Sequence, residues 1–165
     1  MCSSTPEALS AAVLTISDSC ARGEREDLSG PAVAEFLRDR DFSIAGTQTV
    51  PDEAGAIQQA IVCWTPQARL VVTTGGTGIG PRDVTPEATR AVCDRILEGI
   101  AERMRLEGSK KTPFAALSRS LCGVRGTTLI LNLPGSPTGA VDSLASVIDL
   151  VPHALQVLAG ETRHE

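Results

Sequence analysis

The chain has 165 residues, the length of one ordinary domain, and it is long enough to bury a sizeable core. Its net charge of -5 and its aromatic content of 2% argue against a basic nucleic-acid groove or an aromatic stacking platform. Its five cysteines have no Cys-x-x-Cys spacing, so they indicate neither a disulfide framework nor a zinc site. We find no apolar stretch long enough for a signal core or a membrane span. We therefore expect one soluble, cytoplasmic domain over residues 1–165, with loose ends at 1–9 and 160–165 and with no nucleic-acid or membrane partner.

Hydrophobic periodicity predicts strands that alternate with helices along most of the chain. Apolar residues recur at every second position in some segments and at every third or fourth position in others, which are the spacings of strands and of helices. This alternation is typical of a parallel sheet covered by helices. In chain order we expect a strand near 11–17, a helix over 30–40, a strand over 43–50, a helix over 53–64, a strand over 69–74, and a helix over 85–107 with a break near Gly99.

The last third of the chain predicts a hairpin followed by a broken helix. Residues 120–124 and 127–133 flank Arg125-Gly126, the length of a two-residue hairpin turn, so one strand should run antiparallel to the others. Apolar residues over 141–158 follow helical spacing, and Pro152 should break this stretch into two helices. The predicted fold is a three-layer αβα domain of the α/β class, whose mostly parallel mixed sheet contains one antiparallel strand.

Four loops leave the carboxyl ends of the predicted parallel strands and should gather at one edge of the sheet. They span residues 18–29, 51–52, 75–85 and 134–137. Open α/β sheets bind their ligands at this edge. We therefore expect polar side chains from the four loops to meet there.

The run TTGGTGIGPRDVTPE, residues 73–87, joins a buried strand to a helix through a loop with few side chains. Glycines let backbone N–H groups approach a ligand closely, and a helix with Thr85 as its N-cap and Pro86 at its first position adds a dipole that favours anions. The loop therefore suits a phosphate, although a tight turn with positive φ would have a similar composition. It is neither a P-loop nor a dinucleotide fingerprint, because its glycine order differs from both and the lysines, Lys110 and Lys111, lie outside it.

Two aspartates beside these loops each have a functional and a structural interpretation. Asp83 could hold a Mg²⁺ ion that bridges nucleotide phosphates, or it could form an ordinary turn or cap before the helix. Asp52 directly precedes the helix over 53–64, where it is a natural N-cap.

Several other polar residues have the same ambiguity. Arg82 and Arg119 could offset the charge of a polyanionic substrate, or they could be solvated surface charges. Ser17-Asp18 and Ser29-Gly30 could contact a ligand or be ordinary turn residues. Ser136 could cap the last helix, whose N-terminus would also be a second anion site.

The run 73–87 resembles the signature of the molybdopterin adenylyltransferases, the MogA- and MoaB-like group that includes the G domain of gephyrin. Other segments carry the same resemblance, in order and spread along the chain, so that it covers about residues 10–160. These segments are LTISDS at 14–19, DLSGP at 27–31, VPDE at 50–53, LSRS at 117–120, GVRG at 123–126 and LILNLPGSP at 129–137.

The resemblance implies an enzyme that transfers AMP from Mg-ATP to the terminal phosphate of molybdopterin and releases pyrophosphate. It also implies catalytic roles for Asp83 and Asp52, a Mg²⁺ ion held by Asp83, a homotrimer, and a downstream molybdenum-insertion protein as a candidate partner. The matching substrate-binding positions are Ser17, Asp18, Ser29, Gly30, Thr74, Gly75, Gly76, Thr77, Gly78, Arg82, Glu87, Ser118, Arg119, Pro134, Gly135 and Ser136.

Two alternative functions stay open. A related domain occurs in nucleotide-processing enzymes of the competence-damage type, which would make this chain a nucleotide hydrolase. A pterin-binding or oligomerising module without turnover would correspond to the scaffold role of gephyrin. The matches at Ser29-Gly30, 118–120 and 132–135 favour the pterin enzyme over the hydrolase, and the presence of both Asp52 and Asp83 argues against a module without catalysis.

Overall fold

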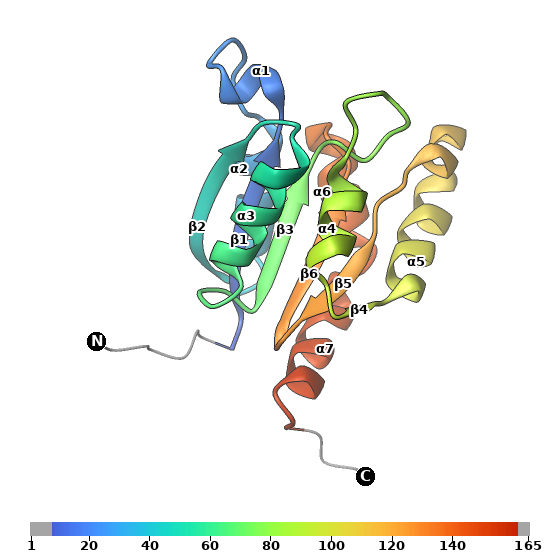
Figure 1. The fold of residues 1–165 in the computed structure, drawn as a ribbon. Coiled ribbons are helices and arrows are strands. Elements are labelled where there is room, and N and C mark those ends of the chain that lie inside the picture. The colour runs from blue at the N-terminus through green and yellow to red at the C-terminus, as the bar shows by residue number, and fades with distance from the viewer. Residues whose placement is uncertain (1–7, 162–165) are drawn as a thin grey trace.

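A six-stranded mixed sheet forms the centre of the computed structural model, which describes residues 8–161 (Figure 1). The strand order is β2-β1-β3-β6-β5-β4. β2, β1, β3 and β6 pair in parallel, whereas β5 is antiparallel to both of its neighbours, which confirms the predicted single antiparallel strand. The strands are β1 (Ser10–Ile16), β2 (Ser43–Val50), β3 (Leu70–Thr74), β4 (Arg95–Ile96), β5 (Cys122–Arg125) and β6 (Thr128–Leu133).

Helices cover both faces of the sheet, so the fold has the three predicted layers. One face carries α2 (Ser29–Arg38), α5 (Glu98–Ser109), α6 (Pro137–Ala145) and α7 (Val151–Leu158). The other face carries α3 (Ala54–Trp64) and α4 (Thr85–Val92). Shorter helical segments are α1 (Asp18–Ala21), η1 (Pro113–Leu117) and η2 (Ile148–Leu150).

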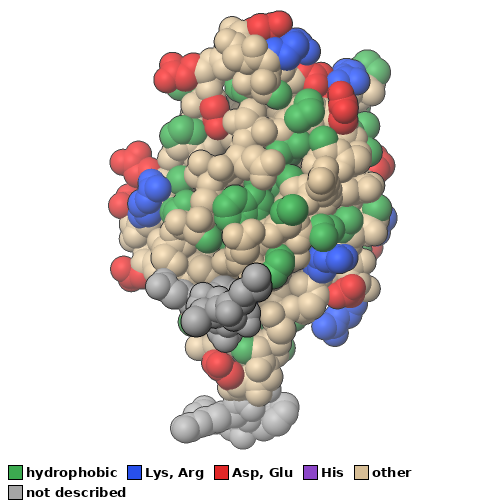
Figure 2. Space-filling model, turned by 60° about the vertical axis from the view of Figure 1, so that its left-hand side comes forward, with side chains coloured by type: hydrophobic (Ala, Val, Ile, Leu, Met, Phe, Trp, Pro, Cys, Tyr) green, Lys and Arg blue, Asp and Glu red, His purple; other side chains and the backbone are tan. Residues whose placement is uncertain are grey.

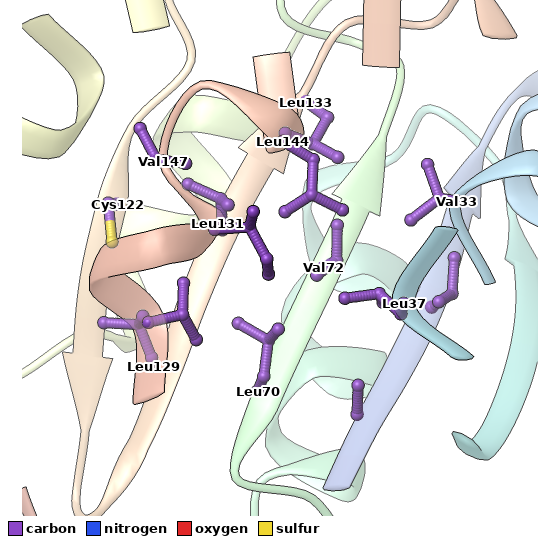
Figure 3. Packing of buried hydrophobic residues seen from close by; sticks show 14 of the residues in the cluster. Val33, Leu37, Leu70, Val72, Cys122, Leu129, Leu131, Leu133, Leu144 and Val147 are labelled. Carbon is purple, nitrogen blue, oxygen red and sulfur yellow. The ribbon is translucent and has the colours of Figure 1, made fainter. Parts of the chain in front are cut away.

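β3 is buried on both faces because its successive side chains point into two different cores. Leu70 and Val72 belong to the larger core, beneath α2 and α6, whereas Val71 belongs to the smaller core beneath α3 and α4. Figure 3 shows Leu70 and Val72 in the larger core, with Leu37 of α2 and Leu144 of α6. Each such buried aliphatic side chain contributes about 1.5–3 kcal/mol. The core therefore fixes the end of β3, from which the glycine-rich loop starts.

The predicted helix over 85–107 does break, but the predicted position of the break, near Gly99, is wrong: the break lies at residues 93–97. α4 ends at Val92, and the chain then forms the short strand β4 before α5 begins at Glu98, so Gly99 lies in the first turn of α5 and not at a break. The reason is long-range: the N–H groups of Asp94 and Leu97 donate to carbonyls of β5. Pairing with a distant strand overrides helical periodicity here, because periodicity reports only local spacing.

The structure confirms the hairpin and the broken C-terminal helix, with small shifts. Arg125 pairs with Thr128, so the turn residues are Gly126 and Thr127, one position later than predicted, and Gly126 has a φ of 58° that suits glycine. The last helix is broken between α6 and α7, and Pro152 lies in the first turn of α7, where its missing N–H costs nothing.

Among residues 8–161, no single helix is both long and apolar enough to cross a membrane. The bent pair of α6 with residues 148–158 passes a test of length and composition, as core helices do, and Leu144, Val151 and Leu155 of this pair are buried in the larger core. Most of the two predicted loose ends, residues 1–7 and 162–165, lies outside the described residues.

Candidate active site at the carboxyl ends of the strands

The loops that follow β1, β2, β3 and β6 meet at one edge of the sheet, at the top of Figure 1. Between them lies a cavity of about 350 Å³, here called the polar cavity. The expected convergence of the four loops is therefore confirmed. Residues from the predicted substrate-binding set that line the cavity are Ser17, Ser29, Thr74, Gly75, Gly76, Gly135 and Ser136, and both candidate catalytic aspartates, Asp52 and Asp83, line it too.

The polar cavity is acidic. Its lining contains the carboxyl-bearing residues Glu26, Asp27, Asp52 and Asp83, together with Arg25. Charged side chains also gather at the top of the molecule, where α1 lies (Figure 2). An anionic ligand in this cavity therefore needs a cation to accompany it.

The glycine-rich loop bends where β3 ends, and two of its glycines are required by geometry. Gly75 and Gly76 have φ values of 94° and 68°, in the left-handed region. A Cβ atom on Gly75 would lie 2.3 Å from the carbonyl oxygen of Ile16, and one on Gly76 would lie 2.2 Å from Oγ1 of Thr85. The tight-turn interpretation is thus correct for these two residues, and the same crowding brings the loop backbone to the cavity wall.

The prediction that Thr85 is the N-cap of α4 is wrong. It is the first helical residue, Val84 occupies the cap position, and Pro86 lies in the first turn. The N–H of Thr85 donates to the carbonyl of Gly76 at 3.1 Å. Its hydroxyl is buried and has no hydrogen-bond partner among the described residues.

The side chain of Asp83 points back towards earlier residues of its own loop. Its Oδ2 accepts a hydrogen bond from the N–H of Gly80 at 2.8 Å and lies 2.9 Å from where a Cβ on Gly78 would be. Oδ1 accepts no hydrogen bond from the described residues. Asp83 therefore braces the loop with one oxygen, and the second oxygen is available for a hard cation such as Mg²⁺.

Asp52 does not cap α3, so this part of the prediction is wrong. The cap position belongs to Glu53, which makes no side-chain cap bond. Instead, Oδ2 of Asp52 accepts from the N–H of Asp18 at 2.9 Å, and Oδ1 of Asp18 accepts from the N–H of Asp52 at 3.0 Å. This reciprocal pair ties the start of α1 to the loop after β2.

The two aspartates of this pair have opposite pKa shifts. Partial burial raises the pKa of Asp52, and the nearby charges of Asp18 and Asp83 raise it further. The hydrogen bond from the N–H of Asp52 lowers the pKa of Asp18, and Arg82 lowers it further. Of these two aspartates, Asp52 is therefore the one whose ionised form gains more from a cation nearby.

Arg82 and Arg119 do not line the polar cavity. The Nε and Nη2 atoms of Arg82 each donate to a carboxylate oxygen of Asp18 at 3.0 Å. Nε of Arg119 donates to the carbonyl of Gly78 at 2.7 Å, and Nη2 donates to the carbonyl of Asp83 at 2.7 Å. Nη1 of Arg119 pairs with Glu87, which lies outside the polar cavity as well. Both guanidinium groups thus hold the glycine-rich loop.

The remaining hydroxyl residues hold loops and helix starts together. Ser29 shares a buried hydrogen bond with Thr74 at 2.8 Å. Ser17 caps α1 by accepting from the N–H of Cys20, and Ser136 caps α6 by accepting from the N–H of Gly139, which is the structural role considered for it. Gly30 is required because a Cβ there would lie 2.5 Å from both Asp27 and Thr15.

A second cavity of about 730 Å³, here called the apolar cavity, adjoins the polar one. Its lining includes Ile79, Phe114 and Leu117, and it shares Gly135 and Ser136 with the polar cavity. Four further predicted positions, Thr77, Gly78, Ser118 and Pro134, also line it. The segment of Ser118 is therefore part of the site, although strand direction alone did not place it there.

Sequence reasoning missed several residues of this site. Asp27 accepts hydrogen bonds from Oγ1 of Thr15 at 2.6 Å and from the N–H of Gly30 at 3.0 Å, so it joins β1 to the start of α2. Its position three residues before Gly30 is a capping pattern that could have revealed it. Phe114 and Leu117 give no comparable signal, because short apolar segments are usually core.

The donor chemistry of the polar cavity fits a magnesium ion. Within residues 8–161 there is no group of three or more His, Cys, Asp or Glu side chains that could hold a metal. Mg²⁺ prefers oxygen ligands and is commonly bound by one or two carboxylates together with substrate phosphates and water. Asp83, with Asp52 in the same cavity, provides such carboxylates.

Comparisons with known proteins agree with this geometry. Residues 12–153 match the family described as "Probable molybdopterin binding domain". The molybdopterin adenylyltransferase of Helicobacter pylori (strain J99) is 40% identical over 155 residues, which cover 90% of this chain and 86% of that protein. The molybdenum cofactor synthesis protein cinnamon of Drosophila melanogaster is 41% identical over 94% of this chain, but the chain spans only 26% of that longer protein.

A solved structure shows the same fold at high identity. The crystal structure of the molybdopterin biosynthesis enzyme MoaB from Thermus thermophilus has a TM-score of 0.87 and 49% identity, and the match covers 92% of this chain and 97% of that one. The fold, the site at the carboxyl edge and these likenesses agree, and the chain belongs to the molybdopterin-binding family of molybdenum cofactor biosynthesis proteins.

Proposed function

We propose that this protein is a molybdopterin adenylyltransferase, which transfers AMP from Mg-ATP to the terminal phosphate of molybdopterin and releases pyrophosphate. One observation carries the proposal: an acidic polar cavity and a larger apolar cavity share the wall formed by Gly135 and Ser136. Two ligands of different polarity can therefore meet at one point. The 40% identity to the Helicobacter pylori adenylyltransferase supports this reading.

The apolar cavity is assigned to the pterin. Its volume of about 730 Å³ lies in the usual range for small-molecule sites, roughly 300–1,000 Å³. Phe114, Leu117 and Ile79 offer apolar surface to a flat ring, while Ser118 and Ser136 offer hydroxyls to its polar edge. The terminal phosphate of the pterin would then lie at the shared wall, towards the polar cavity.

The polar cavity is assigned to the phosphates of ATP. Asp83 and Asp52 would hold a Mg²⁺ ion, which neutralises charge on the nucleotide phosphates when it is bound. The bent backbone at Gly75 and Gly76 brings the loop against the same ligand.

The reaction needs little acid–base chemistry from the protein. A phosphate monoester has a second pKa of about 6, so the attacking oxygen is already ionised at neutral pH. That oxygen forms a bond to the α-phosphorus of ATP, and the bond from this phosphorus to the pyrophosphate oxygen breaks. The chain's residues are required chiefly to position the two ligands and to stabilise charge, as in other phosphoryl transfers.

We further propose a homotrimer in the cytoplasm, whose product passes to a molybdenum-insertion protein. Exposed apolar side chains outside the two cavities support an assembly: Leu106 and Val157 are 68% and 46% exposed. The cysteines at positions 20, 63, 93 and 122 are free, as in a reducing compartment. Light scattering on the purified protein tests the trimer, and a monomer at micromolar concentration would reject it.

Mass spectrometry tests the proposed activity. The protein is incubated with molybdopterin and Mg-ATP, and the expected result is adenylated molybdopterin, formed only when all three are present. Formation of ADP or AMP without pterin would favour the nucleotide hydrolase. Binding of pterin without any nucleotide consumption would favour the module without turnover.

A further inference from the structure

Arg119 joins the two ends of the exposed part of the glycine-rich loop. Its guanidinium donates to the carbonyl of Gly78 near the start of this part and to the carbonyl of Asp83 at its end, both at 2.7 Å. Its own N–H donates to the carbonyl of Thr77 at 2.8 Å, and its Nη1 pairs with Glu87 in α4. A planar guanidinium group with several fixed donors suits this kind of bridging.

The side chain of Arg119 lies outside the two cavities that are assigned to the ligands. It lines neither the polar nor the apolar cavity, but a separate hollow with Pro86, Glu87, Arg90 and Leu121. Its guanidinium would have to break its hydrogen bonds to the loop in order to reach a phosphate in either cavity. This placement favours a role for Arg119 in holding the loop over direct contact with substrate.

Few other hydrogen bonds hold the exposed part of the glycine-rich loop in place. Residues 79–82 are exposed. Besides Arg119, they are held by the two hydrogen bonds between Gly80 and Asp83 and by the pair of Arg82 with Asp18. None of these interactions connects the loop to the segment of Ser118, which lines the apolar cavity. Arg119 makes that connection.

We propose that Arg119 is a positioning residue, which fixes Gly78 and the carboxylate of Asp83 relative to Ser118 and thereby aligns the walls of the two cavities. This proposal rests on the proposed adenylyl transfer for its kinetic consequences. Its structural consequence, an ordered loop, is independent of any activity. An error of about 1 Å in the placement of reacting groups can cost roughly 100-fold in rate.

The matched control is Arg105. Its Nη1 donates to the carbonyls of Ser118 and Ser120, on either side of Arg119, but it makes no hydrogen bond to the glycine-rich loop. Arg105→Ala therefore perturbs the same segment without releasing the loop. Arg119→Lys keeps the positive charge but loses the planar guanidinium group that bonds to two carbonyls at once. Glu87→Gln weakens the pairing of Arg119 with α4 without removing the arginine.

Hydrogen exchange and magnesium-dependent kinetics test the proposal on the full chain. Arg119→Ala should increase amide exchange over residues 77–84 in the ligand-free protein, and Arg105→Ala should not. It should also lower kcat by about 100-fold and shift the Mg²⁺ dependence of the rate to higher concentration. Arg119→Lys and Glu87→Gln should give intermediate values, which keeps the test decisive if Arg119→Ala fails to fold.

Two results would overturn the proposal. Exchange over 77–84 that is the same in the Arg119 and Arg105 variants would show that Arg119 does not order the loop. A raised KM for ATP at unchanged Mg²⁺ dependence would show direct phosphate contact. If the wild-type protein forms no adenylated pterin, the proposed function fails, but the exchange measurement still decides whether Arg119 holds the loop.

Discussion

The polar and apolar cavities share two residues, yet the chain builds them in different ways. The polar cavity is formed by loops that directly follow β1, β2, β3 and β6, and it contains four carboxyl-bearing residues. The apolar cavity is larger and takes much of its lining from α5, η1 and α6, which cross from other parts of the fold. Most of the apolar lining surface lies in the apolar cavity, whose charged lining residues are Glu107, Lys111 and Asp142.

This difference suggests that binding and charge stabilisation are divided between the two cavities. Carboxylates in the polar cavity contribute to ligand binding only when a cation and a phosphate are present. The apolar cavity contributes to ligand affinity by removing apolar surface from water. A change in one cavity should therefore alter one ligand far more than the other. The following variants test that division, from the largest expected effect to the smallest.

Asp83→Asn should abolish most adenylyl transfer, with a loss of at least about 100-fold in kcat. The substitution keeps an oxygen that can accept from the N–H of Gly80, so the loop and the melting temperature should change little. The affinity for molybdopterin alone, measured by calorimetry, should stay within about threefold. Full activity of this variant at limiting Mg²⁺ would contradict the assignment of Asp83 to the metal.

Gly76→Val should weaken Mg-ATP binding by at least about tenfold while affecting molybdopterin less, because Gly76 lines only the polar cavity. The new side chain would meet Thr85 and must adopt a positive φ, with a strain of about 1–3 kcal/mol.

Gly23→Val is the control for strain alone, since Gly23 also has a positive φ but its Cβ would meet nothing within 4 Å. Calorimetry and thermal melts on both variants separate the two causes. Normal Mg-ATP affinity in folded Gly76→Val would remove the glycine-rich loop from the nucleotide site.

Lys110→Ala combined with Lys111→Ala should leave Mg-ATP binding within about twofold, because both lysines lie away from the polar cavity. Lys111 lines the apolar cavity and pairs with Asp142 at 2.9 Å, an exposed ion pair of the kind worth roughly 0–1 kcal/mol. Molybdopterin affinity should therefore fall by no more than about fivefold. Complete loss of ATP binding by the folded variant would show that the phosphates bind elsewhere.

Asp52→Asn should change the pH dependence of stability by a small amount. The folded-state pKa of Asp52 is raised, so this group favours the folded state while it is protonated, and its contribution is lost as pH rises through the raised pKa. Wild-type stability relative to the variant should therefore fall from about pH 4 upwards. Urea unfolding of both proteins between pH 4 and 7 measures this difference, and a difference that rises with pH would contradict it.

Sequence reasoning predicted the polar cavity better than the apolar one, for a physical reason. β1, β3 and β6 are apolar strands, and their parallel order brings the loops at 17–18, 75–83 and 134–136 to one edge. Chain direction alone supports that inference. The apolar cavity depends on how η1 and α5 pack across the sheet edge, and no local pattern around Phe114 encodes this packing.

The structural errors have a similar origin. Nothing local shows that Arg95 and Ile96 pair with β5, so the sequence places the break of the helix over 85–107 near Gly99 and not at these two residues. Nothing local shows that Asp52 bonds to the N–H of Asp18, which lies 34 positions away, so a helix cap was the natural interpretation. For Arg119 the sequence shows a charge that could offset a phosphate or be solvated, but it does not show that the guanidinium bonds to the carbonyls of Gly78 and Asp83.

The most direct test of the two-cavity account is pyrophosphate release as a function of molybdopterin concentration. The account predicts that pyrophosphate appears only when molybdopterin is present, in a one-to-one ratio with adenylated pterin, because the attacking phosphate must come from the apolar cavity. It also predicts that Asp83→Asn removes both products together. Pyrophosphate or inorganic phosphate released at the same rate without pterin would contradict the account, because the polar cavity would then act alone.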